Sequence, residues 1–279
     1  MGGSLGLALQ AAGYRGRVVA LGRDPSDVQA AIDAGAIHEG VTGPEDLPNS
    51  VGLYCVAVPL SAMSGALQQI APRLRGAEAV VTDVGSVKVP VVNAASRILP
   101  HPCNFVGGHP MAGFRHRGVS FARADLFHGV TTILTPVSAT RRAALECVRS
   151  LWETVQAHVT IMTAAEHDEV VARVSHLPHA VAAMLLLQAA RDGGLDVAGA
   201  GLLDVTRVAA RDVELWQDIL VCNRDQVRRA LGQLVDEFKR LDAWLERHED
   251  GNIARLLSRA AQIRDEWVAQ KFDHPDWID

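Results

Sequence analysis

The feature that most constrains the fold is the alternation of short, continuous apolar runs with helical stretches in the first part of the chain. Runs with apolar residues at consecutive positions are typical of parallel strands that are buried on both faces. Helical stretches between such strands cover the two faces of one sheet. We therefore predict a doubly wound, mainly parallel α/β domain. Its strands are expected within residues 17–22, 51–59, 77–86, 103–110 and 130–136.

The chain opens with MGGSLGLALQ, in which two glycines and a serine precede an apolar helical stretch. In a Rossmann-like domain, a glycine-rich turn after the first strand brings backbone to the pyrophosphate at the positive end of a helix. We predict that Gly2, Gly3, Ser4 and Leu5 form the second half of such a turn. The first strand and two further glycines precede such a turn, so we expect the natural chain to begin about ten residues upstream. A simple N-terminal helix cap is the alternative.

A second cofactor signal lies about 20 residues further on, where NAD-specific sites place a carboxylate for the ribose hydroxyls. Here the strand ends at Gly22, followed by Arg23 and Asp24. Gly22 carries no carboxylate to repel a 2′-phosphate, and the guanidinium of Arg23 is suited to pair with one in a bidentate manner. We therefore favour NADP as the cofactor. Asp24 keeps NAD open, and a solvated surface role is the alternative for Arg23.

The second half of the chain has helical patterns only, from about Thr163 onward. We place a dinucleotide-binding domain at residues 1–163 and an all-helical substrate and dimerisation domain at residues 164–279. Pro178 is expected to kink or divide the first long helical segment. Helices this long and apolar often pair across a two-fold axis, which predicts a homodimer. A monomeric helical bundle is the alternative.

Composition excludes several classes of protein. The formal net charge of −5 argues against a nucleic-acid binder, which usually carries a basic excess. The four cysteines lie far apart with no CxxC pair, so we expect reduced thiols and neither disulfides nor a zinc site. The longest apolar run, residues 180–187, is too short to cross a bilayer. We expect a cytoplasmic protein with a small-molecule substrate and no membrane partner.

Four motifs carry polar residues of catalytic type. DVGSVK (residues 83–88) and GGHPMAG (residues 107–113) each follow an apolar strand, and SHLPHAV (residues 175–181) and DVTR (residues 204–207) lie in the helical half. In this order and spacing, and with the opening GGSLGLAL, they resemble the prephenate/arogenate dehydrogenase family of tyrosine biosynthesis. The resemblance extends from Met1 to about Asn223.

The resemblance implies oxidation of a cyclohexadienol at the carbon that bears the hydroxyl, with hydride transfer to NADP or NAD and loss of CO2. A neutral histidine is a suitable base for the hydroxyl proton, and His109 is the candidate. Ser86 would hydrogen-bond the same hydroxyl or orient His109. Arg207 would bind a substrate carboxylate as a fork. By resemblance, His179 borders the substrate.

Other positions follow from their place after a strand, where ligands bind in open α/β sheets. We expect Val58, Pro59, Asp83 and Gly85 to contact the cofactor. By resemblance, His176 and Asp168 shape the pocket. Simpler roles remain open: His109 as a buried loop histidine, Ser86 as a helix cap, and Arg207 as an ion-pair partner of Asp204 or Asp212.

A metal site is the alternative for the histidines, because His176 and His179 share a helical face and His167 lies upstream. A third ligand and a chemical need for metal are lacking, so we predict none.

The chain departs from the family after HPMAG, where a small hydroxyl residue and then an acidic residue are usual. Here Phe114 and Arg115 follow Gly113. We expect Gly113 and Phe114 to contact the substrate, and the added positive charge to favour dianionic prephenate over zwitterionic arogenate. The alternatives are an arogenate or amino-substituted prephenate dehydrogenase, a β-hydroxyacid-type dehydrogenase, and a non-catalytic nucleotide-binding regulator.

Overall fold

The structure is a computed structural model that describes residues 1–76, 78–113, 118–209 and 212–271. The predictions for Phe114 and Arg115 lie outside these residues. The chain forms two compact units, residues 1–227 and residues 228–279, and each is described by itself.

The first unit is built on a five-stranded sheet with the order β3-β4-β5-β6-β7. Strands β3, β4 and β5 are parallel, β6 is antiparallel to β5, and β7 is parallel to β6. The mainly parallel sheet of the predicted Rossmann-like domain is confirmed. The strands are β3 (Leu53–Val56), β4 (Val80–Asp83), β5 (Phe105–Pro110), β6 (Thr131–Thr135) and β7 (His158–Ile161).

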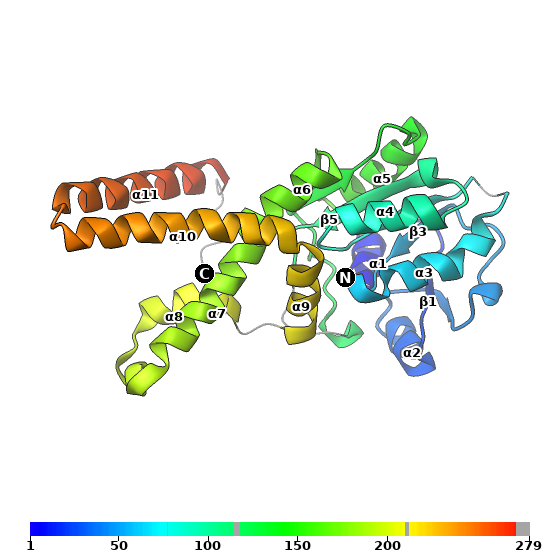
Figure 1. The fold of residues 1–279 in the computed structure, drawn as a ribbon. Coiled ribbons are helices and arrows are strands. Elements are labelled where there is room, and N and C mark those ends of the chain that lie inside the picture. The colour runs from blue at the N-terminus through cyan, green and yellow to red at the C-terminus, as the bar shows by residue number, and fades with distance from the viewer. Residues whose placement is uncertain (77, 114–117, 210–211, 272–279) are drawn as a thin grey trace. The chain divides into compact units, whose positions relative to one another are not determined.

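Helices cover both faces of this sheet (Figure 1). On one face, α3 (Met63–Ile70) and α4 (Val89–Ile98) pack on Val56 and Val81. On the other, α1 (Gly2–Ala11) and α5 (Arg142–Thr154) pack on Cys55 and Val80. Neighbouring residues of one strand thus enter different cores, because successive strand side chains point to opposite faces. This double burial explains why the strands are continuously apolar.

A second, two-stranded parallel sheet contains β1 (Val19–Leu21) and β2 (Glu39–Val41), with α2 (Pro25–Asp33) beside it. In a Rossmann sheet, the first strand lies between the strands that correspond here to β1 and β3. Among the described residues no strand joins these two, so the expected single sheet is present as two.

The short strands β2 and β7 were not predicted. β2 contains Gly40, and most of the β7 residues are exposed, so neither shows a continuous apolar pattern.

Helical structure continues without a break from α6 (Ala164–Val171) through a π-helical turn (Ala172–His176) to α7 (Leu177–Ala189). Thr163 caps α6 in a capping box with Glu166. Pro178 lies just after the π turn, in the first turn of α7, so the division expected at this proline is absent. By length and composition this run is apolar enough to cross a membrane, with 22% of its most apolar window buried. The shorter apolar run 180–187 predicts no span, whereas the helix as a whole extends over Ala164–Ala189.

The helical half of the first unit continues with α8 (Ala200–Thr206) and α9 (Val213–Cys222). Helix α10 (Arg224–Glu246) begins in this unit and extends into the second. The second unit also contains α11 (Asp250–Lys271).

Candidate active site

The ends of β4 and β5 bring two of the motifs together. These strands are parallel neighbours, so Asp83 at the end of β4 lies beside the GGHP segment of β5. The Asp83 carboxylate accepts hydrogen bonds from Gly85 N (2.7 Å) and Gly108 N (3.1 Å) and forms an ion pair with Lys88. Lys88 Nζ also donates to Gly108 O at 2.7 Å. The buried Asp83–Lys88 pair therefore fixes both loops to one another.

The close approach of the two loops requires a glycine in β5. A Cβ at Gly108 would lie 2.7 Å from the Asp83 carbonyl oxygen, closer than side chains tolerate. The Asp83 carboxylate is fully enclosed. The cofactor contacts predicted for Asp83 and Gly85 stay predictions.

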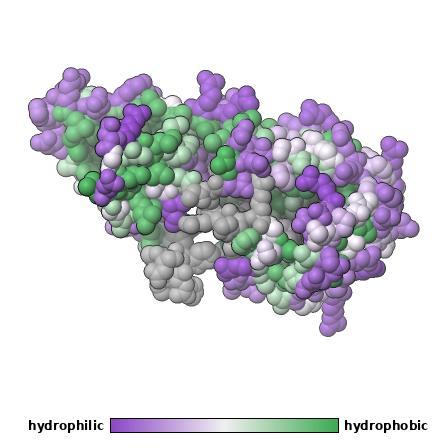
Figure 2. Space-filling model, turned by 90° about the horizontal axis from the view of Figure 1, so that it is seen from below, coloured by the Kyte–Doolittle hydropathy of each residue, from purple (hydrophilic) through white to green (hydrophobic). Residues whose placement is uncertain are grey.

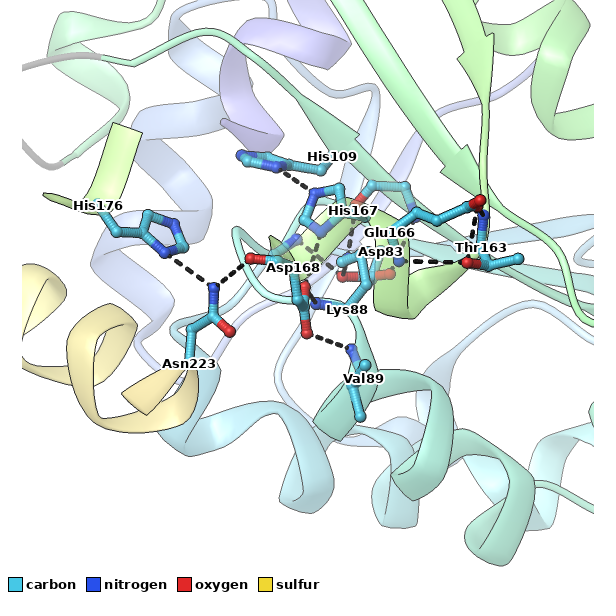
Figure 3. A network of polar contacts seen from close by, with 12 residues as sticks. Asp83, Lys88, Val89, His109, Thr163, Glu166, His167, Asp168, His176 and Asn223 are labelled. Carbon is cyan, nitrogen blue, oxygen red and sulfur yellow. Dashed lines mark hydrogen bonds and ion pairs between the residues drawn. The ribbon is translucent and has the colours of Figure 1, made fainter. Parts of the chain in front are cut away.

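His109, near the end of β5, lies in a row of hydrogen-bonded side chains (Figure 3). Its Nδ1 lies 2.8 Å from Nε2 of His167, and Nδ1 of His167 lies 2.7 Å from Oδ1 of Asp168. All three side chains are buried. His109 is therefore not a histidine that is merely covered by a loop, since it ends a directed polar network.

Burial lowers the pKa of His109 well below its usual value, and neighbouring His167, Lys88 and His176 lower it further. Burial also lowers the pKa of His167, although the hydrogen bond that this ring donates to Asp168 opposes the shift. The pKa of His176 falls to about 4, again chiefly through burial. The three imidazoles are therefore neutral near pH 7, which is the state that a general base needs.

Asp168 connects this network to the first turn of α4. Its carboxylate accepts hydrogen bonds from Lys88 N (2.7 Å) and Val89 N (2.8 Å), two donors that helix geometry leaves without a helical partner. The Asn223 amide donates to the Asp168 carbonyl oxygen (2.8 Å) and to His176 Nδ1 (3.1 Å). Residues from α4, α6, the π turn and the junction between α9 and α10 are thus held together.

A second histidine, His179, lies in the first turns of α7. Its ring stacks on Trp216 of α9, with ring centroids 3.4 Å apart and an interplanar angle of 21°. His179 Nδ1 donates to the Ser175 carbonyl oxygen at 2.8 Å, and His176 meets the same tryptophan edge-on. The stacked pair forms a flat, aromatic wall with polar edges.

The site also contains His167, Asn223 and Trp216, which the sequence motifs do not predict as site residues. The spacing of His167 suggests only a metal ligand. The adjacent pair His167–Asp168 at the start of a helix was the available signal, because a carboxylate next to a histidine can orient its ring. Nothing in the local sequence marks Asn223 or Trp216.

Ser86 lies half-buried in the loop between β4 and α4. The N-cap of α4 is Lys88, so the alternative role of Ser86 as a helix cap is wrong. Gly113 is exposed. Arg207 is exposed at the start of a 3-10 turn. Within the described residues, no hydrogen bond or ion pair joins Arg207 to the His109 network, to Asp204 or to Asp212.

The N-terminus of α1 fits the phosphate end of a dinucleotide. The first helical bond runs from Leu5 N to Met1 O, so the N–H groups of Gly2, Gly3 and Ser4 have no helical acceptor. A Cβ at Gly2 would lie 3.2 Å from Ala57, the residue before Val58 and Pro59. The backbone N–H groups at the start of α1 therefore lie beside the end of β3. The Ser4 hydroxyl accepts from Arg123 N (3.1 Å), and Leu5 lies in the core.

The end of β1 carries the remaining predicted cofactor residues. Gly22 is half-buried, and a Cβ there would lie 2.5 Å from Val28 of α2. Arg23 is exposed. Asp24 is the N-cap of α2, and its Oδ1 accepts from the Ser26 backbone N–H (2.8 Å) and hydroxyl (2.7 Å). Part of the Asp24 carboxylate is therefore occupied by the helix that follows.

In the described part of the chain, no group of three His, Cys, Asp or Glu side chains is arranged to hold a metal ion. The two nitrogens of His167 are both engaged, with His109 and Asp168. His167 is thus unsuited to the metal role that its spacing suggested.

The sequence matches two family models. Residues 5–161 match "Prephenate dehydrogenase, nucleotide-binding domain" and residues 163–259 match "Prephenate dehydrogenase, dimerization domain". A prephenate dehydrogenase of Bacillus subtilis is 31% identical over 95% of this chain and 73% of its own length. A cyclohexadienyl dehydrogenase of Zymomonas mobilis is 30% identical over 86% of this chain and 84% of its own.

Solved structures agree with these matches. A prephenate dehydrogenase from Aquifex aeolicus, in complex with hydroxyphenyl propionate and NAD+, has a TM-score of 0.89 and 30% identity, covering 95% of this chain and 93% of that one. A Synechocystis arogenate dehydrogenase has a TM-score of 0.83 and 27% identity, covering 96% of each chain. Together with the family models, these likenesses show that the chain belongs to the prephenate dehydrogenase family.

Proposed function

We propose that this chain oxidises prephenate to 4-hydroxyphenylpyruvate, with hydride transfer to a nicotinamide dinucleotide and loss of CO2, in tyrosine biosynthesis. The observation that carries the proposal is the neutral, buried His109 at a strand end, directly beside the loop that contains Ser86. The names of the relatives, prephenate and cyclohexadienyl dehydrogenase, support it.

The reaction removes a proton from the ring hydroxyl while a hydride leaves the carbon that bears it. The nicotinamide ring, when bound, accepts the hydride. His109 takes the hydroxyl proton as a general base, a role worth about 10²- to 10⁴-fold in rate. Ser86 hydrogen-bonds the same hydroxyl and keeps it directed toward His109. The ring carboxyl group then leaves as CO2, its bonding electron pair makes the ring aromatic, and the resulting phenolate oxygen takes back a proton.

The substrate side of the site is assigned to Arg207, His179 and Gly113. The stacked rings of His179 and Trp216 form a flat wall suited to a planar ring. Arg207 supplies a fork-shaped donor for a carboxylate. The exposed position of Arg207 leaves its guanidinium open to a ligand.

For the cofactor we propose NADP over NAD. Gly22 offers no carboxylate at the end of β1, Arg23 is exposed, and Asp24 is engaged with Ser26 as a helix cap. The backbone donors of Gly2, Gly3 and Ser4 are assigned to the pyrophosphate. Val58 and Pro59, after β3, are assigned to the dinucleotide in the same crevice.

We also propose that the chain is a homodimer, with residues 1–163 as the dinucleotide-binding domain and residues 164–279 as the dimerisation domain. Large apolar side chains of the helical half are exposed, as on α7 and α8: Met184, Leu185, Leu187, Leu203 and Val205. Figure 2 shows apolar residues gathered together on the face of the molecule that it draws. Continuous apolar surface of this kind marks an interaction site. Light scattering of the purified protein, with and without detergent, separates a dimer from a monomer and from a membrane-bound protein.

The central experiment measures initial rates with prephenate and with arogenate, each with NADP and with NAD, by following reduced nicotinamide. We expect turnover of prephenate with NADP at the highest kcat/KM. Preference for arogenate would replace the proposed substrate but keep the chemistry. Tight binding of the dinucleotide without turnover of either substrate would contradict the proposal and favour a regulatory protein.

A further inference from the structure

His109 makes its buried hydrogen bond through one ring nitrogen only. Nδ1 lies 2.8 Å from His167 Nε2, while Nε2 of His109 lies at the opposite side of the ring from this contact (Figure 3). A base must present a lone pair, and a neutral imidazole has one lone pair and one N–H. Which nitrogen carries the proton therefore decides whether His109 acts as a base at Nε2.

The hydrogen-bond partners of Asp168 set the direction of the whole row. Lys88 N and Val89 N can only donate, so both oxygens of Asp168 serve as acceptors. Oδ1 therefore accepts from His167 Nδ1–H at 2.7 Å. The neutral His167 ring then has its lone pair on Nε2, which accepts from Nδ1–H of His109. This leaves the lone pair of His109 on Nε2.

The same contacts disfavour the opposite tautomers, in which both rings carry their proton on Nε2. In that arrangement the Nδ1 lone pair of His167 would face a carboxylate oxygen of Asp168. A doubly protonated His167 would also reverse the second hydrogen bond, but burial lowers the pKa of this ring and nearby Lys88 lowers it further, against the opposing effect of Asp168 and Asp83. His176, the other histidine near the row, is neutral as well because its pKa is about 4.

We propose that His167 is a positioning residue for catalysis: anchored by Asp168, it holds His109 in the tautomer with the proton on Nδ1 and the lone pair on Nε2. The inference rests on the proposed role of His109 as the base. In serine proteases an aspartate orients the histidine directly, and its replacement by asparagine lowers kcat by about 10⁴-fold through the wrong tautomer. Here a second imidazole stands between the carboxylate and the base.

The same carboxylate sets the position of the second catalytic group. By holding Lys88 N and Val89 N, Asp168 fixes the start of α4 and hence the end of the loop that carries Ser86. Asp168 thus connects the segment that orients His109 with the segment that presents Ser86.

The tautomers can be read without turnover. The full-length protein, labelled with 15N-histidine, is examined at pH 7 by long-range 1H–15N correlation spectroscopy. His109→Gln and His167→Gln variants assign the two rings. We expect both rings to carry a single proton, on Nδ1, with an unprotonated Nε2. A proton on Nε2 of His109, or on both nitrogens of His167, would overturn the proposal.

Kinetics with variants of His167 supply a second test. His167→Leu offers no acceptor to His109, so we expect kcat to fall at least tenfold with little change in KM. His167→Gln places an amide oxygen near the former Nε2 position, and we expect it to recover at least threefold over His167→Leu. His158→Gln, at an exposed histidine of β7, is the matched control and should match the unmodified protein. Equal activity of the Gln and Leu variants would count against positioning.

The two proposals fail in different ways. If the tautomers are as expected but no substrate is turned over, the function is wrong and the arrangement of the row stands. If prephenate is turned over but His109 carries its proton on Nε2, the function stands and the role of His167 is lost.

Discussion

Two polar regions of the first unit are held in opposite ways. Around His109, every polar side chain of the row is buried and held by short hydrogen bonds to residues from several elements. At the end of β1, Arg23 is exposed and Asp24 makes only local contacts in its own helix. A buried polar group is costly unless all its hydrogen bonds are made. The proposed chemistry therefore depends on buried groups with fixed partners, whereas the proposed cofactor preference depends on the exposed residues at the end of β1, here called the rim.

The largest effect is expected at His109. His109→Asn removes the proposed base but keeps a polar side chain, so kcat should fall by about 10³- to 10⁴-fold, the upper part of the range for a general base. Dinucleotide affinity, measured by fluorescence titration, should remain within about twofold, because the rim is unchanged. A kcat within tenfold of the unmodified enzyme would remove His109 from the role of base.

The next effect concerns the stability of the buried region. Lys88→Met leaves the Asp83 carboxylate buried without its cation, which should lower the free energy of unfolding by about 3 to 5 kcal/mol. The matched control is Arg17→Met, which breaks the exposed ion pair with Glu39 and should cost less than about 1 kcal/mol. Urea unfolding measures both. Equal losses would show that the buried and exposed regions do not differ as described.

A third prediction uses pH. His176 has a folded pKa of about 4 against 6.5 for an ordinary histidine, so the unfolded chain binds its proton first as the pH falls. The neutral His176 ring therefore contributes to the free energy of unfolding in full above pH 6.5, and this contribution is lost as the pH falls to about 4. The difference between the two pKa values corresponds to about 3 kcal/mol. In His176→Gln, the free energy of unfolding should therefore fall less steeply over this interval. Parallel curves for the two proteins would contradict the buried, neutral state of His176.

The smallest effect is expected at the rim. Arg23→Ala should raise the KM for NADP about tenfold, as loss of about 1.4 kcal/mol of phosphate binding implies, and leave the KM for NAD unchanged. Arg15→Ala, at another exposed arginine, is the control. A change of similar size with both dinucleotides would separate Arg23 from the 2′-phosphate.

The sequence predicts the layers of the fold well but not the connections within the site. The strands around Cys55 and Val81 were found because burial on both faces leaves a continuous apolar run. β2 and β7 are short and partly exposed, so they leave no such run. His109 was found from its motif. The contact between His109 and His167 joins residues 58 positions apart, and no local pattern encodes it.

The π-helical turn over Ala172–His176 amounts to one extra residue within an otherwise regular helix. Each residue of an α-helix advances the chain by about 100° around its axis. Deleting exposed Val174, a single codon, would allow the turn to become α-helical and would leave His167 and His179 in nearly the same phase, because the π turn already absorbs the extra residue. A deletion elsewhere in the helix between these two histidines, where no such turn absorbs it, would rotate His179 by about 100° relative to His167. Both histidines would then be present but out of phase, so insertions and deletions outside the turn are the ones that selection is expected to remove first.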